Sequence, residues 1–229
     1  MIEYDILSSG SKGNATVING EILIDCGVPA RSLSRYIKTL RLVLLTHQHG
    51  DHLNPAAIRY LALERPSLRF ICGPWLYDRT LKAGALKLQV DRMLPGETAV
   101  YNAGRISTKP GYEITMAPAK HDVPNCGYKV ILPSGEKLFY MTDTNTLDSI
   151  VAKGFDLYML EANWEEAGMR ERITAAMESG QYQYEWRAIE NHLSKEKADN
   201  WLYQNMGPNS QYIYLHCHED IDSGGVSNE

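Results

Sequence analysis

Short apolar runs separated by turn-forming residues make up most of the hydrophobic pattern of the chain. Runs of this kind, bounded by Gly, Pro, Asn and Ser, predict β-strands. Asn19-Gly20, between two of them, is a strong signal for a two-residue hairpin turn. The predicted strands are 2–7, 15–18, 21–25, 42–46, 68–71, 86–90, 98–101, 105–108, 112–117, 128–132, 137–142, 155–161 and 211–216.

A few segments between these runs carry helix signals instead. Pro29 opens a stretch to residue 40 in which apolar residues recur at helical spacing. Asn54-Pro55 supplies a cap and a favoured first residue for a helix over 55–64. We also expect a helix that begins at Gly73-Pro74-Trp75 and another over 195–204.

Residues 162–191 mix charged and aromatic residues without a clean period. We interpret this stretch as a functional loop or lid, because long structureless segments inside a domain are uncommon. No internal repeat or linker divides the chain, so we expect residues 1–229 to form one domain. Many strands with a few interleaved helices indicate the α/β class, with mixed sheets in one sandwich.

The composition is that of an ordinary globular protein with enough residues for its own core. The chain has 229 residues, of which 44% are hydrophobic and 22% charged. Its four cysteines are scattered and form no C-x-x-C pair, which favours a reducing compartment. There is no signal-peptide pattern and no apolar run long enough to span a membrane, so we expect a cytoplasmic protein without a membrane partner.

The charge balance argues against strong non-specific binding to nucleic acid, because the net charge is −5. The first half of the chain is nevertheless slightly basic and the second half acidic. Arg31, Arg35, Lys38 and Arg41 fall at roughly helical spacing. The favoured interpretation is a solvated helix face, and a surface that follows phosphates is the alternative.

The strongest chemical signal is the block His47-Gln48-His49-Gly50-Asp51-His52, which follows an apolar strand. His47 and His49 project to the same side of an extended chain, and Asp51 and His52 follow where the backbone must turn. Four ligands on one ion would leave no open position for catalysis. Two adjacent ions therefore fit better, one held by His47 and His49 and the other by Asp51 and His52.

Further ligands must come from other parts of the chain. His121, Asp143 and His216 each lie at the end of a predicted strand or in the loop after it. Asp143 is a candidate bridge, since one carboxylate can bind two ions. Nitrogen-rich sites that also contain carboxylates favour Zn²⁺, with Mn²⁺ or Fe as alternatives.

These residues carry a resemblance to a known family. The segment Ile24-Asp25-Cys26-Gly27, the block at 47–52, His121, Asp143 and His216 follow the order of the metallo-β-lactamase superfamily, which the chain resembles along essentially its whole length. The resemblance implies a four-layer αβ/βα sandwich with two metal ions at the edge of its two sheets. It also implies that Asp25 is not a ligand but supports the histidine loop through a hydrogen bond. The alternative is that Asp25 only caps the following turn.

Two further motifs resemble the phosphodiesterase branches of that superfamily, which include tRNase Z and the β-CASP nucleases. They are Leu160-Glu161-Ala162-Asn163 and Asn191-His192-Leu193-Ser194, and the resemblance implies that His192, supported by Glu161, assists the scissile phosphate. The two motifs and the segment 9–14 resemble most closely the YycJ/WalJ-like group, whose members are regarded as DNA exonucleases or nuclease-like hydrolases. The segment 9–14 is not a P-loop. The alternatives are that His192 caps a helix and that Glu161 ends a strand in solvent.

The chemistry of phosphodiester hydrolysis agrees with this branch. Two ions ~3.5–4 Å apart can supply a bridging hydroxide and neutralise the phosphate oxygens. Asp51 and Asp143 could orient that hydroxide and accept its proton, while His192 with Glu161 serves the leaving group. The candidate substrate contacts are Ser11, Lys12, Asn14 and Arg187.

The sequence thus predicts a dinuclear phosphodiesterase that acts on nucleic acid and resembles DNA exonucleases. The alternatives are a hydrolase of a small cyclic or linear phosphodiester, a thioester or β-lactam hydrolase, and a metal-stabilised binding module. Trp164, Tyr182, Tyr184 and Trp186 could stack on single-stranded bases or pack their own segment onto the sandwich. The oligomeric state stays open.

Overall fold

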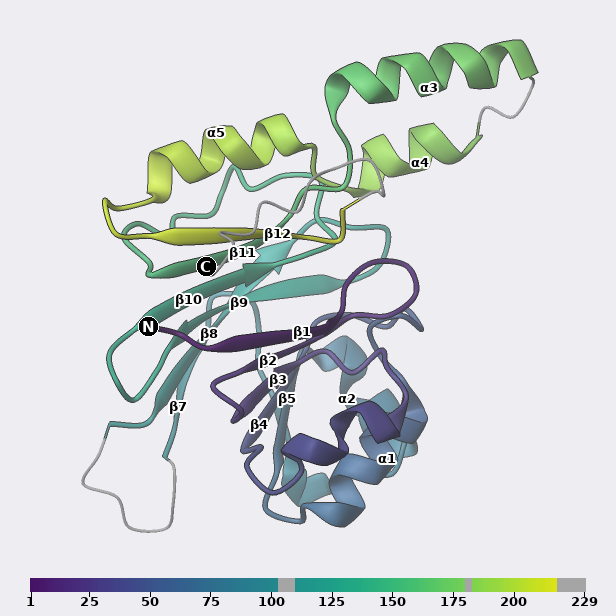
Figure 1. Cartoon of the computed structure of the whole chain (residues 1–229). Helices are drawn as coiled ribbons and strands as arrows, with labels where there is room; N and C mark the ends of the chain where they lie inside the picture. The colour runs from purple at the N-terminus through teal and green to yellow at the C-terminus, as the bar shows by residue number, and fades with distance from the viewer. Residues whose placement is uncertain (103–109, 180–182, 218–229) are drawn as a thin grey trace.

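Two six-stranded sheets face each other at the centre of the computed structural model, which describes residues 1–102, 110–179 and 183–217 (Figure 1). Helices cover the outer face of each sheet. This is the α/β sandwich with two mixed sheets that the sequence predicts. Among the described residues, no helix combines the length and the apolar character that crossing a membrane requires.

The first sheet has the order β1-β2-β3-β4-β5-β6. Its strands are β1 (Tyr4–Ser8), β2 (Ala15–Ile18), β3 (Ile22–Ile24), β4 (Leu42–Leu45), β5 (Arg69–Cys72) and β6 (Val90–Arg92). The first three strands pair antiparallel, and β3 to β6 pair parallel. The parallel pairs are joined by the 3₁₀ helix η1 (Ala30–Tyr36) and the α-helices α1 (Pro55–Glu64) and α2 (Pro74–Lys82).

The second sheet has the order β12-β11-β10-β9-β8-β7. Its strands are β7 (Thr98–Tyr101), β8 (Tyr112–Ala119), β9 (Asn125–Ile131), β10 (Lys137–Met141), β11 (Leu157–Glu161) and β12 (Gln211–Leu215). Strands β7 to β10 pair antiparallel, whereas β10, β11 and β12 run parallel. Helix α5 (Lys195–Asn205) packs on the outer face of this sheet.

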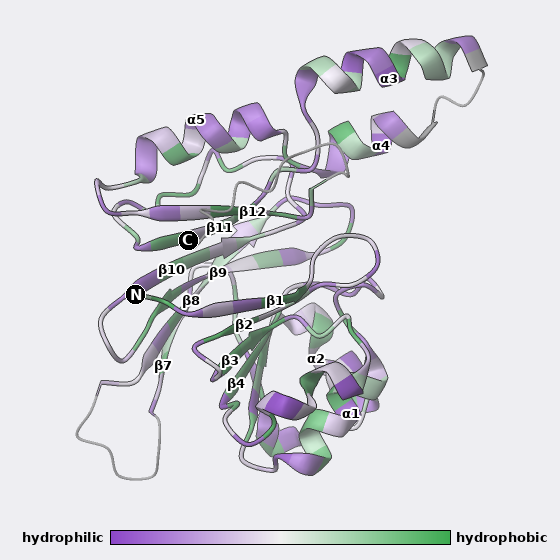
Figure 2. Cartoon of the chain, in the orientation of Figure 1, coloured by the Kyte–Doolittle hydropathy of each residue, from purple (hydrophilic) through white to green (hydrophobic). Residues whose placement is uncertain are grey.

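Apolar side chains fill three layers of the sandwich. Between the sheets, residues such as Ile24 and Leu44 pack against Tyr128 and Met159. Outside the first sheet, α1 contributes Ile58 to a second cluster, and α5 contributes to the third. The hydropathy colouring in Figure 2 agrees, because the central strands are mainly hydrophobic while α5 is mostly hydrophilic on its exposed side.

Three predicted elements differ from the structure. The segment 29–40 forms the short 3₁₀ helix η1 rather than an α-helix, and the hydroxyl of Ser34 donates to the carbonyl of Arg31, a local bond that competes with helix formation. The segment 86–90 is not a strand. It contains a second 3₁₀ turn, η2 (Lys87–Gln89), which leads into β6, because the Gln89 side chain accepts from the amide of Leu86.

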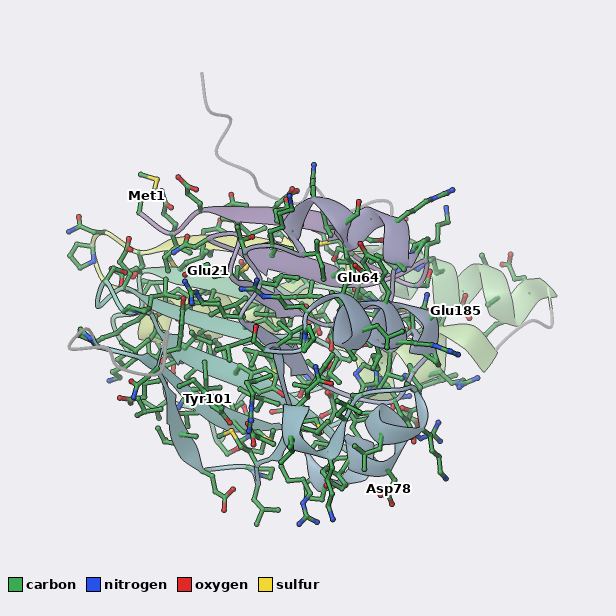
Figure 3. All side chains as sticks on the ribbon, turned by 90° about the horizontal axis from the view of Figure 1, so that it is seen from below. Met1, Glu21, Glu64, Asp78, Tyr101 and Glu185 are labelled. Atoms are coloured by element: carbon green, nitrogen blue, oxygen red, sulfur yellow. The ribbon has the colours of Figure 1, made fainter. Side chains whose placement is uncertain are left out.

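The segment 162–191 is largely helical rather than a loop. It forms α3 (Glu166–Ser179) and α4 (Gln183–Asn191), which project from the sandwich as a hairpin (Figure 1). Met169 and Ile173 are four residues apart in α3 and pack with Trp164 and Ala188, so the helical spacing was present but weak. Figure 3 shows Glu185 of this hairpin beyond the packed side chains of the sandwich. The predicted strand 105–108 lies outside the described residues.

The basic residues near η1 lie on the solvent-exposed surface, as the favoured interpretation of their spacing predicts. Arg35 pairs with Asp5, and Arg41 pairs with Glu21 through contacts at the surface of the first sheet. Neither arginine lines the pocket described below.

Candidate metal centre

The predicted site residues meet at one end of the two sheets, beside the β1–β2 loop and the base of the α3–α4 hairpin (Figure 1). The strands that carry them run in the same direction within each sheet, so their carboxyl ends share an edge, which is where α/β proteins bind ligands. In chain order, Asp25 follows β3, His47 to His52 follow β4, His121 follows β8, Asp143 follows β10, Glu161 ends β11 and His216 follows β12.

Three of these strand-end residues have a left-handed backbone. The φ angles are 57° at Asp25, 54° at Asp143 and 52° at His216. A non-glycine residue pays roughly 1–2 kcal/mol for this conformation, and such residues persist only where their surroundings hold them. Each of them turns the chain sharply out of its strand at the site.

Polar neighbours hold two of these turns, and the sequence interpretation missed them. Asn125 donates from Nδ2 to the carbonyl of Asp143 at 2.6 Å. The amide of His216 donates to Oγ of Ser9 at 2.7 Å, and its carbonyl accepts from Asn163 at 3.0 Å. Ser9 and Asn163 belong to motifs already noted, but nothing local in the sequence indicates that they contact His216.

His47, His49 and His121 form the first group, with one ring nitrogen of each within 4.8 Å of the others. Nε2 of His47 lies 3.1 Å from Nδ1 of His49. Nδ1 of His121 lies 3.1 Å from the carbonyl of Asn191, which leaves its Nε2 buried without a hydrogen-bond partner. Burial lowers the pKa of His47 to about 2 and lowers that of His121, so both are neutral, as metal ligands must be.

His52 belongs to a second group, which it forms with His47 and Asp143, and Asp25 fixes its ring. Oδ2 of Asp25 lies 2.7 Å from Nδ1 of His52, and the same carboxylate accepts from the amide and hydroxyl of Thr46 at 2.9 and 2.8 Å. With Nδ1 donating to Asp25, Nε2 of His52 faces Oδ2 of Asp143 at 3.0 Å and Oδ2 of Asp51 at 3.5 Å. Asp25 is therefore positioned for the supporting role rather than for ligation.

The carboxylates around His52 favour a positive charge at this position. Burial disfavours its charged form, yet the carboxylates of Asp143 and Asp25 raise the pKa of His52 well above its ordinary value.

Asp143 lies between the two groups. Its Oδ1 is 3.3 Å from Nδ1 of His216 and 3.9 Å from Nε2 of His121, and its Oδ2 is buried without a hydrogen-bond partner. Burial would raise the pKa of Asp143, but His52 and His216 hold it well below its usual range, so the carboxylate is ionised. Buried acceptors without partners, gathered around an ionised carboxylate, fit divalent cations.

Glu161 joins the metal groups to a further histidine. This buried carboxylate places Oε1 2.5 Å from Nδ1 of His192 and 3.1 Å from Nδ1 of His216. Its Oε2 accepts from the amides of Thr144 and Leu193 at 3.0 and 3.3 Å. Four contacts to one side chain fix both imidazoles relative to Asp143.

The charge state of this pair suits acid–base chemistry. Burial would lower the pKa of His192, but Glu161 raises it above its ordinary value. Burial would likewise raise the pKa of Glu161, but His192 lowers it.

The two alternative interpretations of His192 and Glu161 do not hold. Ser194 rather than His192 caps α5, through the amide of Lys197, and Glu161 is fully buried rather than in solvent.

A cavity of about 610 Å³ opens over these residues. Ser11 and Arg187 line it, together with Asp51, His192 and Asn191. Lys12 is exposed and is not among the lining residues. Of the four candidate substrate contacts, Ser11 and Arg187 thus lie where a substrate would bind.

Asn14, the fourth candidate, lies against the ligands instead. It is buried, and its Nδ2 is 3.1 Å from Oδ2 of Asp51 and 2.8 Å from Nε2 of His52. Its Oδ1 accepts from the amide of Gly10 at 2.9 Å. This geometry orients the second group and keeps Asn14 out of the cavity wall.

Of the aromatic residues of 162–191 whose side chains the structure describes, Trp164 has the packing role, whereas Trp186 is 42% exposed. Trp164 is buried, packs with Met169 and Ala188, and donates to the carbonyl of His192 at 3.2 Å. It therefore supports the site rather than an open stacking surface. Tyr182 and His218 lie outside the described residues, as does the side chain of Tyr184.

The comparisons with known proteins agree with the fold. The family described as Beta-lactamase superfamily domain matches residues 21–195, so the chain belongs to this family. Members of the superfamily are mostly metal-dependent hydrolases, and the His and Asp groups described above could hold the metal ions of such an enzyme. No curated protein matches the chain with statistical significance.

Two solved structures have the same fold at low sequence identity. The metallo-β-lactamase fold protein YhfI from Bacillus subtilis has a TM-score of 0.66 and 16% identity, over 94% of this chain and 86% of that protein. A long form RNase Z from yeast has a TM-score of 0.60 and 12% identity, over 97% of this chain. The match covers 40% of the yeast protein.

Proposed function

We propose that this chain is a metal-dependent phosphodiesterase that acts on nucleic acid, as DNA exonucleases do, and that it belongs to the YycJ/WalJ-like branch of its superfamily. The observation that carries the proposal is the contact between Glu161 and His192, 2.5 Å apart beside the metal groups. In this proposal residues 1–229 form one hydrolase domain. Four free thiols, three of them buried, support a reducing, cytoplasmic setting.

The Glu161–His192 pair favours phosphodiesters over the other substrates of the superfamily. An alkoxide leaving a phosphodiester needs a proton, whereas a thiolate leaving a thioester does not. His192 borders the cavity, and its Nε2 remains available because Nδ1 is bound to Glu161. A protonated imidazole at that place can donate to the departing oxygen.

The other residues divide the remaining work. Arg187 and Ser11 line the cavity, where they can bind phosphate oxygens. Asp51, which also lines it, can accept the proton of the attacking water. Two divalent ions held by the two groups would lower the pKa of bound water and neutralise the charge of the phosphate. Zn²⁺ is the favoured ion, and Mn²⁺ or Fe are the alternatives.

Nucleic acid is the substrate class that the comparisons favour, since one neighbour of the same fold is an RNase Z. A small cyclic or linear phosphodiester is the second candidate. The net charge of −5 favours it, and a cavity of about 610 Å³ is large enough for a nucleotide-sized ligand. Strong salt dependence of binding would favour the polymer.

The test compares leaving groups in the metal-loaded protein. We expect His192→Ala to slow cleavage of single-stranded DNA or RNA by about 10²–10⁴-fold, because the leaving oxygen loses its acid. We expect a much smaller effect on bis-p-nitrophenyl phosphate, whose leaving group departs without a proton. Initial rates on both substrates, with cyclic nucleotides and a thioester in the same panel, measure the difference.

The control is Glu190→Gln, an exposed residue near the end of α4 and two positions before His192. It should leave both rates unchanged. Cleavage of the thioester alone would reject the phosphodiesterase proposal, and equal losses on both phosphodiesters would reject the role of His192 as the acid.

A further inference from the structure

Asp122 is a carboxylate next to the three-histidine group for which neither the sequence nor the comparisons give a role. It lies in the turn between β8 and β9, directly after His121. Its Oδ1 is 3.2 Å from Nε2 of His121 and 3.4 Å from Nε2 of His49. It also lines the cavity, with a side chain that is 36% exposed.

The contact with His121 brings together two atoms that cannot hydrogen-bond to each other. The carbonyl of Asn191 only accepts, so Nδ1 of His121 carries the ring proton. Nε2 then presents a lone pair, and a carboxylate oxygen of Asp122 presents another at 3.2 Å. The side chain of His121 is only 3% exposed, and its Nε2 has no hydrogen-bond partner.

A metal ion between the two atoms removes this conflict. Ligands at roughly 2.0–2.2 Å from a tetrahedral ion are roughly 3.3 Å from one another. The separation between Asp122 and His121 is close to that value, as is the 3.1 Å between Nε2 of His47 and Nδ1 of His49. Two neighbouring pairs, His47 with His49 and His121 with Asp122, therefore have the spacing of ligands in one coordination shell, and the contact of Asp122 with His49 is made to the other ring nitrogen, Nε2.

We propose that Asp122 is a fourth protein ligand of the ion held by His47, His49 and His121. This inference rests on the proposal that the site holds divalent ions, but not on the identity of the substrate. Because Asp122 is partly exposed and borders the cavity, it can leave the ion when a substrate oxygen binds. The resting site is then closed by the protein itself rather than left open to solvent.

A carboxylate oxygen also changes which ion the group prefers. Imidazole nitrogen suits Zn²⁺, whereas carboxylate oxygen suits Mn²⁺. Asp122 should therefore add more to the affinity for Mn²⁺ than to the affinity for Zn²⁺, and its removal should leave a histidine site that favours Zn²⁺ more strongly.

The test is a titration of the metal-free protein with Zn²⁺ and, separately, with Mn²⁺. Isothermal titration calorimetry measures the affinity of each binding step. The binding step that His49→Ala weakens identifies the three-histidine group. We expect Asp122→Ala to weaken that step by about tenfold or more for Mn²⁺ and by less for Zn²⁺. Asp122→Asn, which keeps an oxygen donor of similar size, should recover part of the Mn²⁺ affinity.

Asp78→Ala is the matched control, because Asp78 is an exposed carboxylate on α2 at the edge of the molecule (Figure 3). It should leave both affinities unchanged. Unaltered affinities in Asp122→Ala would overturn the proposal. Equal losses for the two ions would also overturn it, since they would mean that Asp122 only orients His49. Circular dichroism of each metal-free variant checks that it is folded, and none of these results depends on cleavage of any substrate.

Discussion

Glu161 is the single residue on which most of the site geometry depends. Its carboxylate contacts both His192, which borders the cavity, and His216, which lies beside Asp143. It is fully buried, so its charge is tolerated only because two amides and two imidazoles surround it. Removing the charge while keeping the shape therefore separates electrostatic from steric effects.

We predict that Glu161→Gln shifts the pH dependence of turnover. Glu161 raises the pKa of His192, and an acid works only while protonated, so activity is present at low pH and is lost as pH rises through that pKa. Without the carboxylate the pKa falls, and the descending limb moves to lower pH. At neutral pH we expect a loss of about 10–100-fold, measured as kcat across pH.

Elemental analysis of Glu161→Gln is the control, since Glu161 also contacts His216. A descending limb that stays in place with full metal content would show that Glu161 does not set the protonation of His192. A variant that loses metal and regains turnover when metal is added in excess would assign Glu161 to His216 instead.

At the scale of elements, three loops are packed against one another around the histidine block. The amide of Asn14 donates to the carbonyl of Asp51 at 2.6 Å, and the amide of Cys26 donates to the carbonyl of His52 at 2.9 Å. Gly27 lies so close that a Cβ built on it would be 1.6 Å from the carbonyl oxygen of Asp51. The loops after β1 and β3 thus fix the backbone of the loop after β4.

Gly27→Ala should therefore displace the Asp51–His52 backbone. Because the clash is with main chain, which cannot rotate away, we expect a destabilisation of about 3 kcal/mol or more, above the usual range for overpacking. We also expect weaker metal binding at His52. Urea unfolding of the metal-free protein and metal titration measure the two effects.

Gly50→Ala is the matched control within the same loop. A Cβ at Gly50 meets nothing within 4 Å, and its backbone is not left-handed. It should change stability by less than about 1 kcal/mol. Similar results for the two variants would mean that the loops adjust more freely than the packing around Gly27 indicates.

The elements that the sequence predicted well are those with strong local signals. The Asn19-Gly20 turn has positive φ at both residues, 49° and 67°, as the hairpin between β2 and β3 requires. Asn54 caps α1 by accepting from the amide of Ala56 at 2.9 Å. Where the helical period is weak, as in 162–191, the prediction of a loop was wrong. In 29–40, where local bonds compete, the predicted helical stretch is a 3₁₀ helix rather than an α-helix.

The same difference between local and distant signals applies to the residues of the site. The histidines and carboxylates were recognisable as motifs, and the structure brings them to one sheet edge. The resemblance predicted that Asp25 supports the histidine loop, but Ser9 and Asn125, which hold other strand ends, were not predicted, because their contacts are distant in sequence. Ser9 is 207 residues from His216, and Asn125 is 18 residues from Asp143. Only folding brings such pairs together.

At the scale of the whole molecule, the site joins the two sheets. His47 and His52 follow β4 of the first sheet, whereas Asp143 and His216 follow β10 and β12 of the second. In an unfolded chain the candidate ligands from one sheet are far from those of the other. Ions held by residues of both sheets therefore bind the folded state more tightly and add to its stability by mass action.

We predict that removing metal lowers the melting temperature. One ion at 100 times its dissociation constant stabilises a protein by about 2.7 kcal/mol, and each 1 kcal/mol corresponds to about 2–4 °C in a chain of this size. Chelation should thus lower the midpoint in differential scanning calorimetry by about 5–10 °C for each ion that is removed. A double variant, His47→Ala with Asp143→Ala, should melt at the same temperature with and without chelator, because it lacks ligands from both sheets.

If that variant still lost stability on chelation, the ions would be bound elsewhere. If the natural chain did not respond, the ends of the two sheets would not be joined through metal.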